Sequence, residues 1–269
     1  MYRLGATDGK RIGMRCGDFM TVLDFAQPDR AGSGGAYQGY GANLKDTYKD
    51  NRGRVHSYFA SFDAMQAATF QYSAGWYYAT GGCPTLKLDI GISNYSICQR
   101  SRTCDPGTYG YVFGDMLANT VRAINDYGWQ SQVYIWAGYD AEPAYDSAAH
   151  TRALLDGFTS NDPFYSRIYD FGSAESGYWS DPDIKYVAFG NLRAYTIPEI
   201  LNSGTVNSWR RVMDNVGQWP VDGVETDCPQ SNHFNPNTAW NAWNATGYAT
   251  TNMKYSTDLG SGAQSQCGA

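Results

Sequence analysis

The stretch VYIWAGYDAEP at residues 133–143 decides the fold of this chain. Residues 133–139 are largely apolar, as expected for a buried strand, and Pro143 stops the run. Two carboxylates stand at the end of this strand, Asp140 and Glu142, and residues two apart in a strand project to the same face. In a parallel barrel both acids would therefore project into one cleft at the carboxyl end of the strand. The alternative is that Asp140 caps a turn and Glu142 is only solvated.

Strand-like and helix-like segments alternate on both sides of this stretch. The expected strands are residues 19–25, 86–90, 132–139, 166–171, 184–189 and 221–226. The expected helices are residues 57–80, 111–127, 147–158 and 206–216. The alternation predicts a parallel α/β fold, and 269 residues suit a (β/α)8-type, TIM-like barrel in a single domain, residues 1–269.

Two regions do not follow the alternation. They are a long Gly- and Tyr-rich loop at about residues 27–54 and an irregular tail at about residues 232–269. Only six or seven strands can be recognised, fewer than the eight of a regular barrel. Either the barrel is irregular or one strand has no recognisable apolar pattern. A doubly wound open sheet is the alternative fold, but no Gly-x-Gly-x-x-Gly motif follows any strand, as the dinucleotide site of that fold would require.

The composition argues against some classes of protein and favours others. A net charge of −6 and a pI near 5.0 argue against a nucleic-acid partner, because phosphate binding needs a basic face. There is no run of about 18 apolar residues, so no membrane-spanning helix is expected. The chain has 22 Tyr and 8 Trp but only 17% charged residues, which is typical of secreted proteins that contact polar polymers such as glycans. The oligomeric state stays open.

The six cysteines indicate disulfides rather than a metal site. Cys98 and Cys104 bracket the polar segment QRSRT, which predicts a local disulfide. No Cys-x-x-Cys occurs and the three histidines are widely spaced, so a zinc site is not expected. Disulfides imply an oxidising compartment, and the first residues lack the apolar core of a signal peptide, so we expect a secreted or extracellular protein whose leader has been removed. The alternative is a cytosolic protein with six free thiols. The pairing of four cysteines stays open: Cys16, Cys83, Cys228 and Cys267.

Several other expected strands also end in carboxylates. The acids concerned are Asp24, Asp89, Asp140, Glu142, Asp170, Glu175, Asp222, Glu225 and Asp227. Like charges in one pocket raise at least one pKa, and a carboxyl that stays protonated near neutral pH can act as a general acid. We expect about half of these acids to tie down loops instead, through arginines or backbone N–H groups. A metal site built from Asp24, Asp89 and Asp140 is the alternative, but no Asp-x-Asp-x-Asp-Gly loop is present, so we expect neither a metal nor another cofactor.

Two segments of the chain resemble parts of a known family. Residues 23–27 (LDFAQ) on the first strand and residues 139–143 (YDAEP) on a middle strand are similar to the (β/α)-barrel lysozymes of the fungal and phage type, muramidases that cleave peptidoglycan. The second segment also resembles a strand of related, largely uncharacterised secreted barrel proteins. The resemblance implies that Glu142 is the general acid and that Asp140 and Asp24 assist it. The long loop after the first strand and the insertion that carries Cys98 and Cys104 depart from the family pattern, as does Glu225, and these departures bear on the substrate more than on the fold.

These observations predict a secreted glycoside hydrolase that acts on a polysaccharide, with cell-wall glycan as the polymer that the resemblance implies. The aromatic side chains among the substrate contacts are expected to stack on sugar rings. The expected contacts are Asp89, Trp136, Tyr139, Asp170, Glu175, Tyr178, Trp179 and Glu225. Two other functions stay open on the same scaffold, a non-catalytic carbohydrate-binding protein and a surface or fibre assembly protein.

Overall fold

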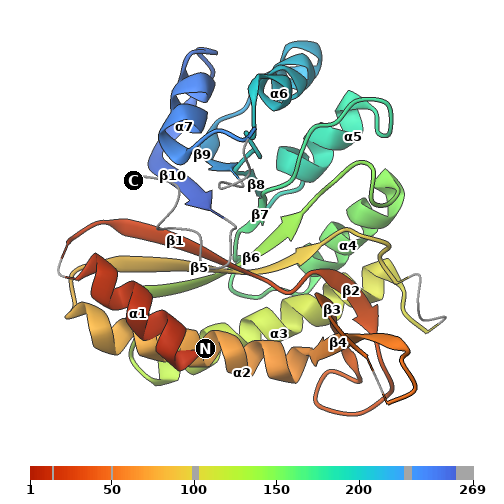
Figure 1. The fold of residues 1–269 in the computed structure, drawn as a ribbon, viewed down its shortest axis with the longest axis vertical. Helices are drawn as coiled ribbons and strands as arrows, with labels where there is room; N and C mark the ends of the chain where they lie inside the picture. Colours follow the sequence, from red (N-terminus) through yellow and green to blue (C-terminus); the bar gives the residue numbers. More distant parts are fainter. Residues whose placement is uncertain (14, 50, 99–102, 227–231, 259–269) are drawn as a thin grey trace.

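The computed structural model describes residues 1–13, 15–49, 51–98, 103–226 and 232–258. Five parallel strands form the main sheet, in an order that follows the chain (Figure 1). They are β1 (Asp18–Asp24), β5 (Thr85–Ser93), β6 (Val133–Asp140), β7 (Ile168–Asp170) and β8 (Ala194–Thr196). The predicted α/β fold with a parallel sheet is confirmed, and the carboxyl ends of these five strands all lie at the same edge of the sheet.

Helices connect the strands and cover the sheet, as parallel strands require. They are α2 (Phe62–Thr80), α3 (Pro106–Asp126), α4 (Ala148–Ser160), α5 (Asp181–Lys185), a π-helix (Tyr186–Gly190) and α6 (Ser203–Val216). Polar residues fix where α2, α3 and α4 begin, because Ser61, Asp105 and Ser147 each accept a hydrogen bond from a backbone N–H of the first turn. In Figure 1, α2 and α3 lie on one side of β1, β5 and β6, whereas α5 and α6 lie beyond β7 and β8 on the other side.

A second pair of parallel strands follows the main sheet. It consists of β9 (Val221–Thr226) and β10 (Thr250–Asp258), which α7 (Pro236–Asn244) connects. Two backbone hydrogen bonds link β9 to the segment after β8: the Ile200 N–H donates to the Glu225 carbonyl at 2.7 Å, and the Glu225 N–H donates to the Pro198 carbonyl at 3.0 Å. Within the described ranges no ladder of hydrogen bonds joins β10 to β1, so closure into the expected TIM-like barrel is not shown.

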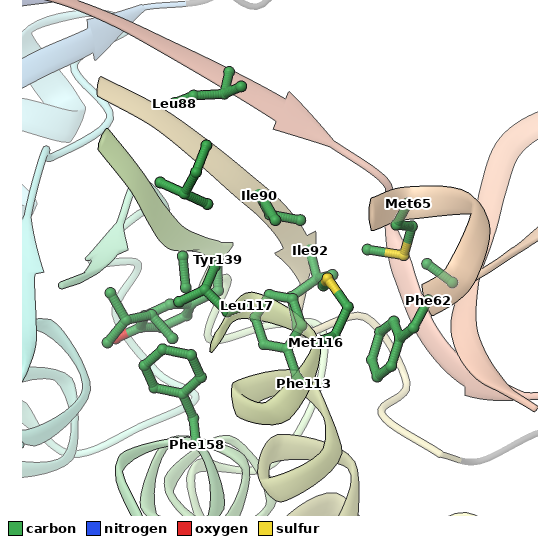
Figure 2. Packing of buried hydrophobic residues seen from close by; sticks show 14 of the residues in the cluster. Phe62, Met65, Leu88, Ile90, Ile92, Phe113, Met116, Leu117, Tyr139 and Phe158 are labelled. Atoms are coloured by element: carbon green, nitrogen blue, oxygen red, sulfur yellow. The ribbon is translucent and has the colours of Figure 1, made fainter. Parts of the chain in front are cut away.

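The largest hydrophobic core lies between the main sheet and the helices α2, α3 and α4. Side chains alternate along β5, so every second residue faces the helices (Figure 2). Figure 2 labels residues that meet there from β5, α3 and α4: Leu88, Ile90, Ile92, Phe113, Met116, Leu117 and Phe158. Burial of each of these side chains stabilises the fold by about 1.5–3 kcal/mol. A smaller apolar cluster of Tyr169, Phe171 and Ile197 covers part of the opposite face of the strands, whereas β1 is half-buried or exposed along its length.

The segment expected as a long loop, about residues 27–54, is largely a sheet. Strands β2 (Gln27–Arg30), β3 (Tyr40–Lys49) and β4 (Val55–Ser61) pair in antiparallel order and lie beside the end of β1 (Figure 1). The expected helix at residues 57–80 therefore begins five residues late, at Phe62, because the preceding residues belong to β4 and Ser61 caps the helix.

Other parts of the sequence-based assignment need correction. The apolar run at residues 184–189 forms the end of α5 and the π-helix instead of a strand, since a short apolar run does not distinguish the two by periodicity. Helix α1 (Tyr2–Ile12) and strand β8 were not predicted. Gly5 and Gly9 weaken the helical signal of α1, yet they allow close packing, because a Cβ on Gly5 would lie 2.1 Å from the Tyr72 carbonyl oxygen of α2. The expected irregular tail contains α7 and β10.

Two cysteine pairs lie at disulfide distance. The predicted pair of Cys98 and Cys104 has a Cα–Cα distance of 4.9 Å, and Cys16 and Cys83, 67 residues apart, have one of 5.0 Å. Cys228 and Cys267 lie outside the described residues, as does Asp227. Among the described helices, none is both long enough and apolar enough to cross a membrane.

Candidate active site

Carboxylates from different strands converge at the carboxyl ends of the strands. Burial raises the pKa of Glu225 well above its ordinary value of 4.5, and the nearby charges of Glu199, Asp140, Asp24 and Asp170 raise it further. Asp24, Asp140 and Asp170 are the last residues of β1, β6 and β7, Glu225 is the last but one of β9, and Glu199 lies three residues after β8, so acids from five strands are brought together at one edge. Glu199 was not among the predicted acids, and unlike the others it lies in the segment after its strand, three residues past the end of β8.

Glu142 is held at this edge by a buried amide side chain. The Glu142 N–H donates to Asn94 Oδ1 at 2.9 Å, and Asn94 Nδ2 donates to the Glu142 carbonyl at 3.0 Å. The backbone N–H of Asn94 also donates to the Asp140 carbonyl at 3.0 Å, which continues the pairing of β5 with β6 past Ser93. Asn94 is 2% exposed, so it fixes the backbone of Glu142 from inside the protein.

The carboxyl of Glu142 has the electrostatic surroundings of a proton donor. Its pKa is raised to about 8, chiefly by burial and then by the negative charges of Glu199 and Asp170. The Ser173 hydroxyl donates a 2.5 Å hydrogen bond to Glu142 Oε2 and lowers the pKa in part. Glu142 therefore keeps its proton to higher pH than an ordinary glutamate does.

Asp24 and Asp140 stand at the ends of β1 and β6 with access to solvent. Asp24 is exposed, and its Oδ1 accepts a hydrogen bond from the Ala26 N–H at 2.8 Å. Asp140 is half-buried and lies close enough to Asp170 and Glu225 to raise the pKa of both. The three residues that the family resemblance singles out, Asp24, Asp140 and Glu142, are thus at the same edge of the sheet.

Asp170 joins two loops. Burial raises the pKa of this carboxyl to about 8. Two backbone hydrogen bonds lower the pKa in part: the Gly172 N–H donates to Oδ1 at 3.0 Å, and the Ala141 backbone donates as well. Gly172 permits this contact, because a Cβ there would lie 2.3 Å from the Ala141 carbonyl oxygen. Asp170 is only 2% exposed, so the structure does not support the expected contact with a substrate. Its hydrogen bonds instead hold the loops after β6 and β7 together.

Asp89 lies away from the strand ends. Strand β5 continues for four residues beyond it, to Ser93, so this acid is in the middle of the strand rather than at its end. Its side chain is fully buried, and its pKa is raised by burial and by the charge of Asp222. Asp222 itself accepts a 2.8 Å hydrogen bond from Arg167. The expected contact between Asp89 and a substrate is therefore not supported.

An aromatic groove adjoins Glu142. The groove has a volume of about 340 Å³ and is lined by residues 143–148 together with Tyr178, Trp179, Ser180 and Asp183. Tyr178 is 60% exposed, and Trp179 is fixed by a 2.8 Å hydrogen bond from its Nε1 to the Asp146 carbonyl. The groove begins at Pro143, directly after Glu142, and the carboxylates lie beside it rather than among its lining residues.

The other predicted contacts lie elsewhere. Tyr139 is buried in the core, where its hydroxyl donates to the Val187 carbonyl, so its ring has no open face for a sugar. Trp136 lines a smaller hollow of about 220 Å³ near the amino end of β6, opposite the acids. Glu175 is exposed on the loop after β7.

These features define a parallel α/β protein whose strand ends carry a partly buried carboxylate cluster. No known protein family, no curated protein and no solved structure matches this chain. Within the described residues, no group of three or more His, Cys, Asp or Glu side chains is arranged to hold a metal ion.

Proposed function

We propose that this protein is a glycoside hydrolase and that Glu142 is its general acid. The observation that carries the proposal is the placement of Glu142, a carboxyl with a pKa of about 8 held by Asn94 and Ser173 among other carboxylates. Glycosidases need a protonated carboxyl beside an ionised one, and environments that push two pKa values apart provide this pair.

The proposed reaction uses the acids in different protonation states. Glu142 gives its proton to the glycosidic oxygen while the bond between that oxygen and the anomeric carbon breaks, and the bonding electrons leave with the oxygen. Asp140 and Glu199 stabilise the positive charge that develops on the sugar ring. Water then adds to the anomeric carbon, and the proton that it loses passes to a carboxylate of the site.

The surroundings of Glu142 suit a polymer of sugars. The groove that starts at Pro143 presents the rings of Tyr145, Tyr178 and Trp179, and such rings stack on the C–H faces of sugars. Tyr95 packs edge-on against Tyr145, with ring centroids 5.2 Å apart, and is itself 47% exposed. A glycan chain bound in this groove would reach Glu142 with one of its linkages.

The proposal extends to architecture and location. The sheet order β1, β5, β6, β7 and β8, followed through the Glu199–Glu225 bridge by β9 and β10, supports an irregular barrel with its acids at one mouth. The two cysteine pairs at disulfide distance are compatible with secretion.

The test is release of reducing sugar from a panel of polysaccharides that includes peptidoglycan. Wild type should release sugar from at least one polymer, and Glu142→Gln should lose about a hundredfold or more of that rate, because the general acid is gone. Asp126→Asn, which removes an exposed acid at the end of α3, should keep the wild-type rate. Equal rates for wild type and Glu142→Gln would remove the assignment.

A further inference from the structure

One buried acid of the cluster lacks a hydrogen-bond partner. Glu225 is fully buried, and neither of its carboxyl oxygens has a hydrogen-bond partner in the described part of the chain. Its backbone is bridged to Glu199, and the charges of Asp24, Asp140 and Glu199 act on its side chain. An unsatisfied buried carboxyl is costly, so a group that donates hydrogen bonds into this cluster would be favoured there.

The acids of this cluster differ in their exposure to solvent. Asp24 is exposed, Asp140, Glu142 and Glu199 are half-buried, and Glu225 is fully buried. The described acids are not arranged as the ligand set of a metal ion. An ammonium group has less demanding geometry, because its three N–H donors rotate and can reach carboxylates that are spread apart.

We propose that this acidic site recognises a glycan that carries free ammonium groups, namely a polymer of amino sugars that is partly or fully deacetylated. The inference rests on the proposed function for the sugar part and adds the chemical class of the substrate. The ammonium group donates charge-assisted hydrogen bonds to the half-buried carboxylates, and the adjoining groove of Tyr145, Tyr178 and Trp179 holds neighbouring sugar rings.

A basic peptide would offer the same charge, but the groove favours a sugar. Its aromatic rings provide flat faces for pyranose rings, and the hydroxyl of Ser147 can donate a hydrogen bond to a sugar hydroxyl. A lysine chain has no rings for these faces. Lysine oligomers therefore serve as the competing probe in the test.

The experiment is calorimetric titration of the full chain with three probes at about pH 6, where a sugar amine is protonated. The probes are a glucosamine hexamer, the N-acetylglucosamine hexamer of the same length and a lysine hexamer. Wild type and Glu142→Gln are both titrated, so that binding is measured with and without turnover. Glu199→Gln and Asp140→Asn remove acids of the cluster, and Asp126→Asn is the matched control for charge.

The glucosamine hexamer should bind at least about tenfold more tightly than its acetylated counterpart, as one added charge-assisted hydrogen bond would give. Its affinity should fall between about 0.05 M and about 0.5 M NaCl. Glu199→Gln and Asp140→Asn should weaken binding, and Asp126→Asn should not. Equal or tighter binding of the acetylated hexamer, or tighter binding of the lysine hexamer, would overturn the inference.

The two proposals fail in different ways. Hydrolysis of neutral glycans without any preference for the glucosamine hexamer would keep the glycosidase and reject the ammonium site. Tight, salt-sensitive binding of the glucosamine hexamer without cleavage of any polymer would keep the ammonium site and reject the glycosidase.

Discussion

At the scale of single residues, Glu142 makes the stability of the protein depend on pH. Its folded-state pKa of about 8 is above the ordinary 4.5, so between these values the unfolded chain releases a proton that the folded chain retains. The free energy of unfolding therefore falls as pH rises through this window, by about 1.4 kcal/mol per pH unit at most. Glu142→Gln removes this effect. We expect the melting temperature of the variant to exceed that of wild type increasingly from pH 4.5 to pH 8. A difference that stays constant over this window would show that Glu142 titrates normally.

Ser173 sets the upper end of the pH range for the proposed activity. Its hydrogen bond to Glu142 Oε2 stabilises the ionised form and lowers the pKa of the acid. Ser173→Ala should raise this pKa further and move the alkaline limb of the pH–rate profile to higher pH, because Glu142 acts only while protonated. Ser160→Ala, which removes an exposed hydroxyl bonded to a backbone carbonyl at the end of α4, is the control and should leave the profile unmoved. A shift of the limb to lower pH in Ser173→Ala would contradict the assigned role.

At the scale of elements, the loops after β6 and β7 depend on their close contact at Gly172. A methyl group at this position would lie 2.3 Å from the Ala141 carbonyl oxygen and would push the two loops apart. We expect Gly172→Ala to lower the free energy of unfolding by about 1–3 kcal/mol and to lower the rate of glycan cleavage, since Glu142 follows Ala141 directly. Gly34→Ala, where a Cβ meets nothing within 4 Å, should change neither quantity. Chemical denaturation and sugar release measure the two effects.

The elements also show what the sequence could and could not predict. The apolar residues of β1, β5, β6 and β9 made these strands predictable, and with them the acids near the ends of β1, β6 and β9. Strand β8 has only three residues and too little pattern to detect, so Glu199 beyond it was missed. Asn94 and Ser173 lie in polar loops, and their contacts with Glu142 depend on strand register, which no local pattern reveals. Asp89 was misplaced because its strand extends past the apolar run that signalled it.

At the scale of the whole molecule, the pair Cys16 and Cys83 connects the segment before β1 to the start of β5 across 67 residues of sequence. In the chain-entropy view, a cross-link stabilises the folded protein more when it closes a longer loop. The expected stabilisation is about 4 kcal/mol for Cys16–Cys83 and about 2 kcal/mol for Cys98–Cys104. We therefore expect Cys16→Ser with Cys83→Ser to lower the free energy of unfolding more than Cys98→Ser with Cys104→Ser. Urea denaturation of the two double variants without reductant measures both losses. An equal or reversed order would contradict the view that the length of the closed loop sets the stabilisation.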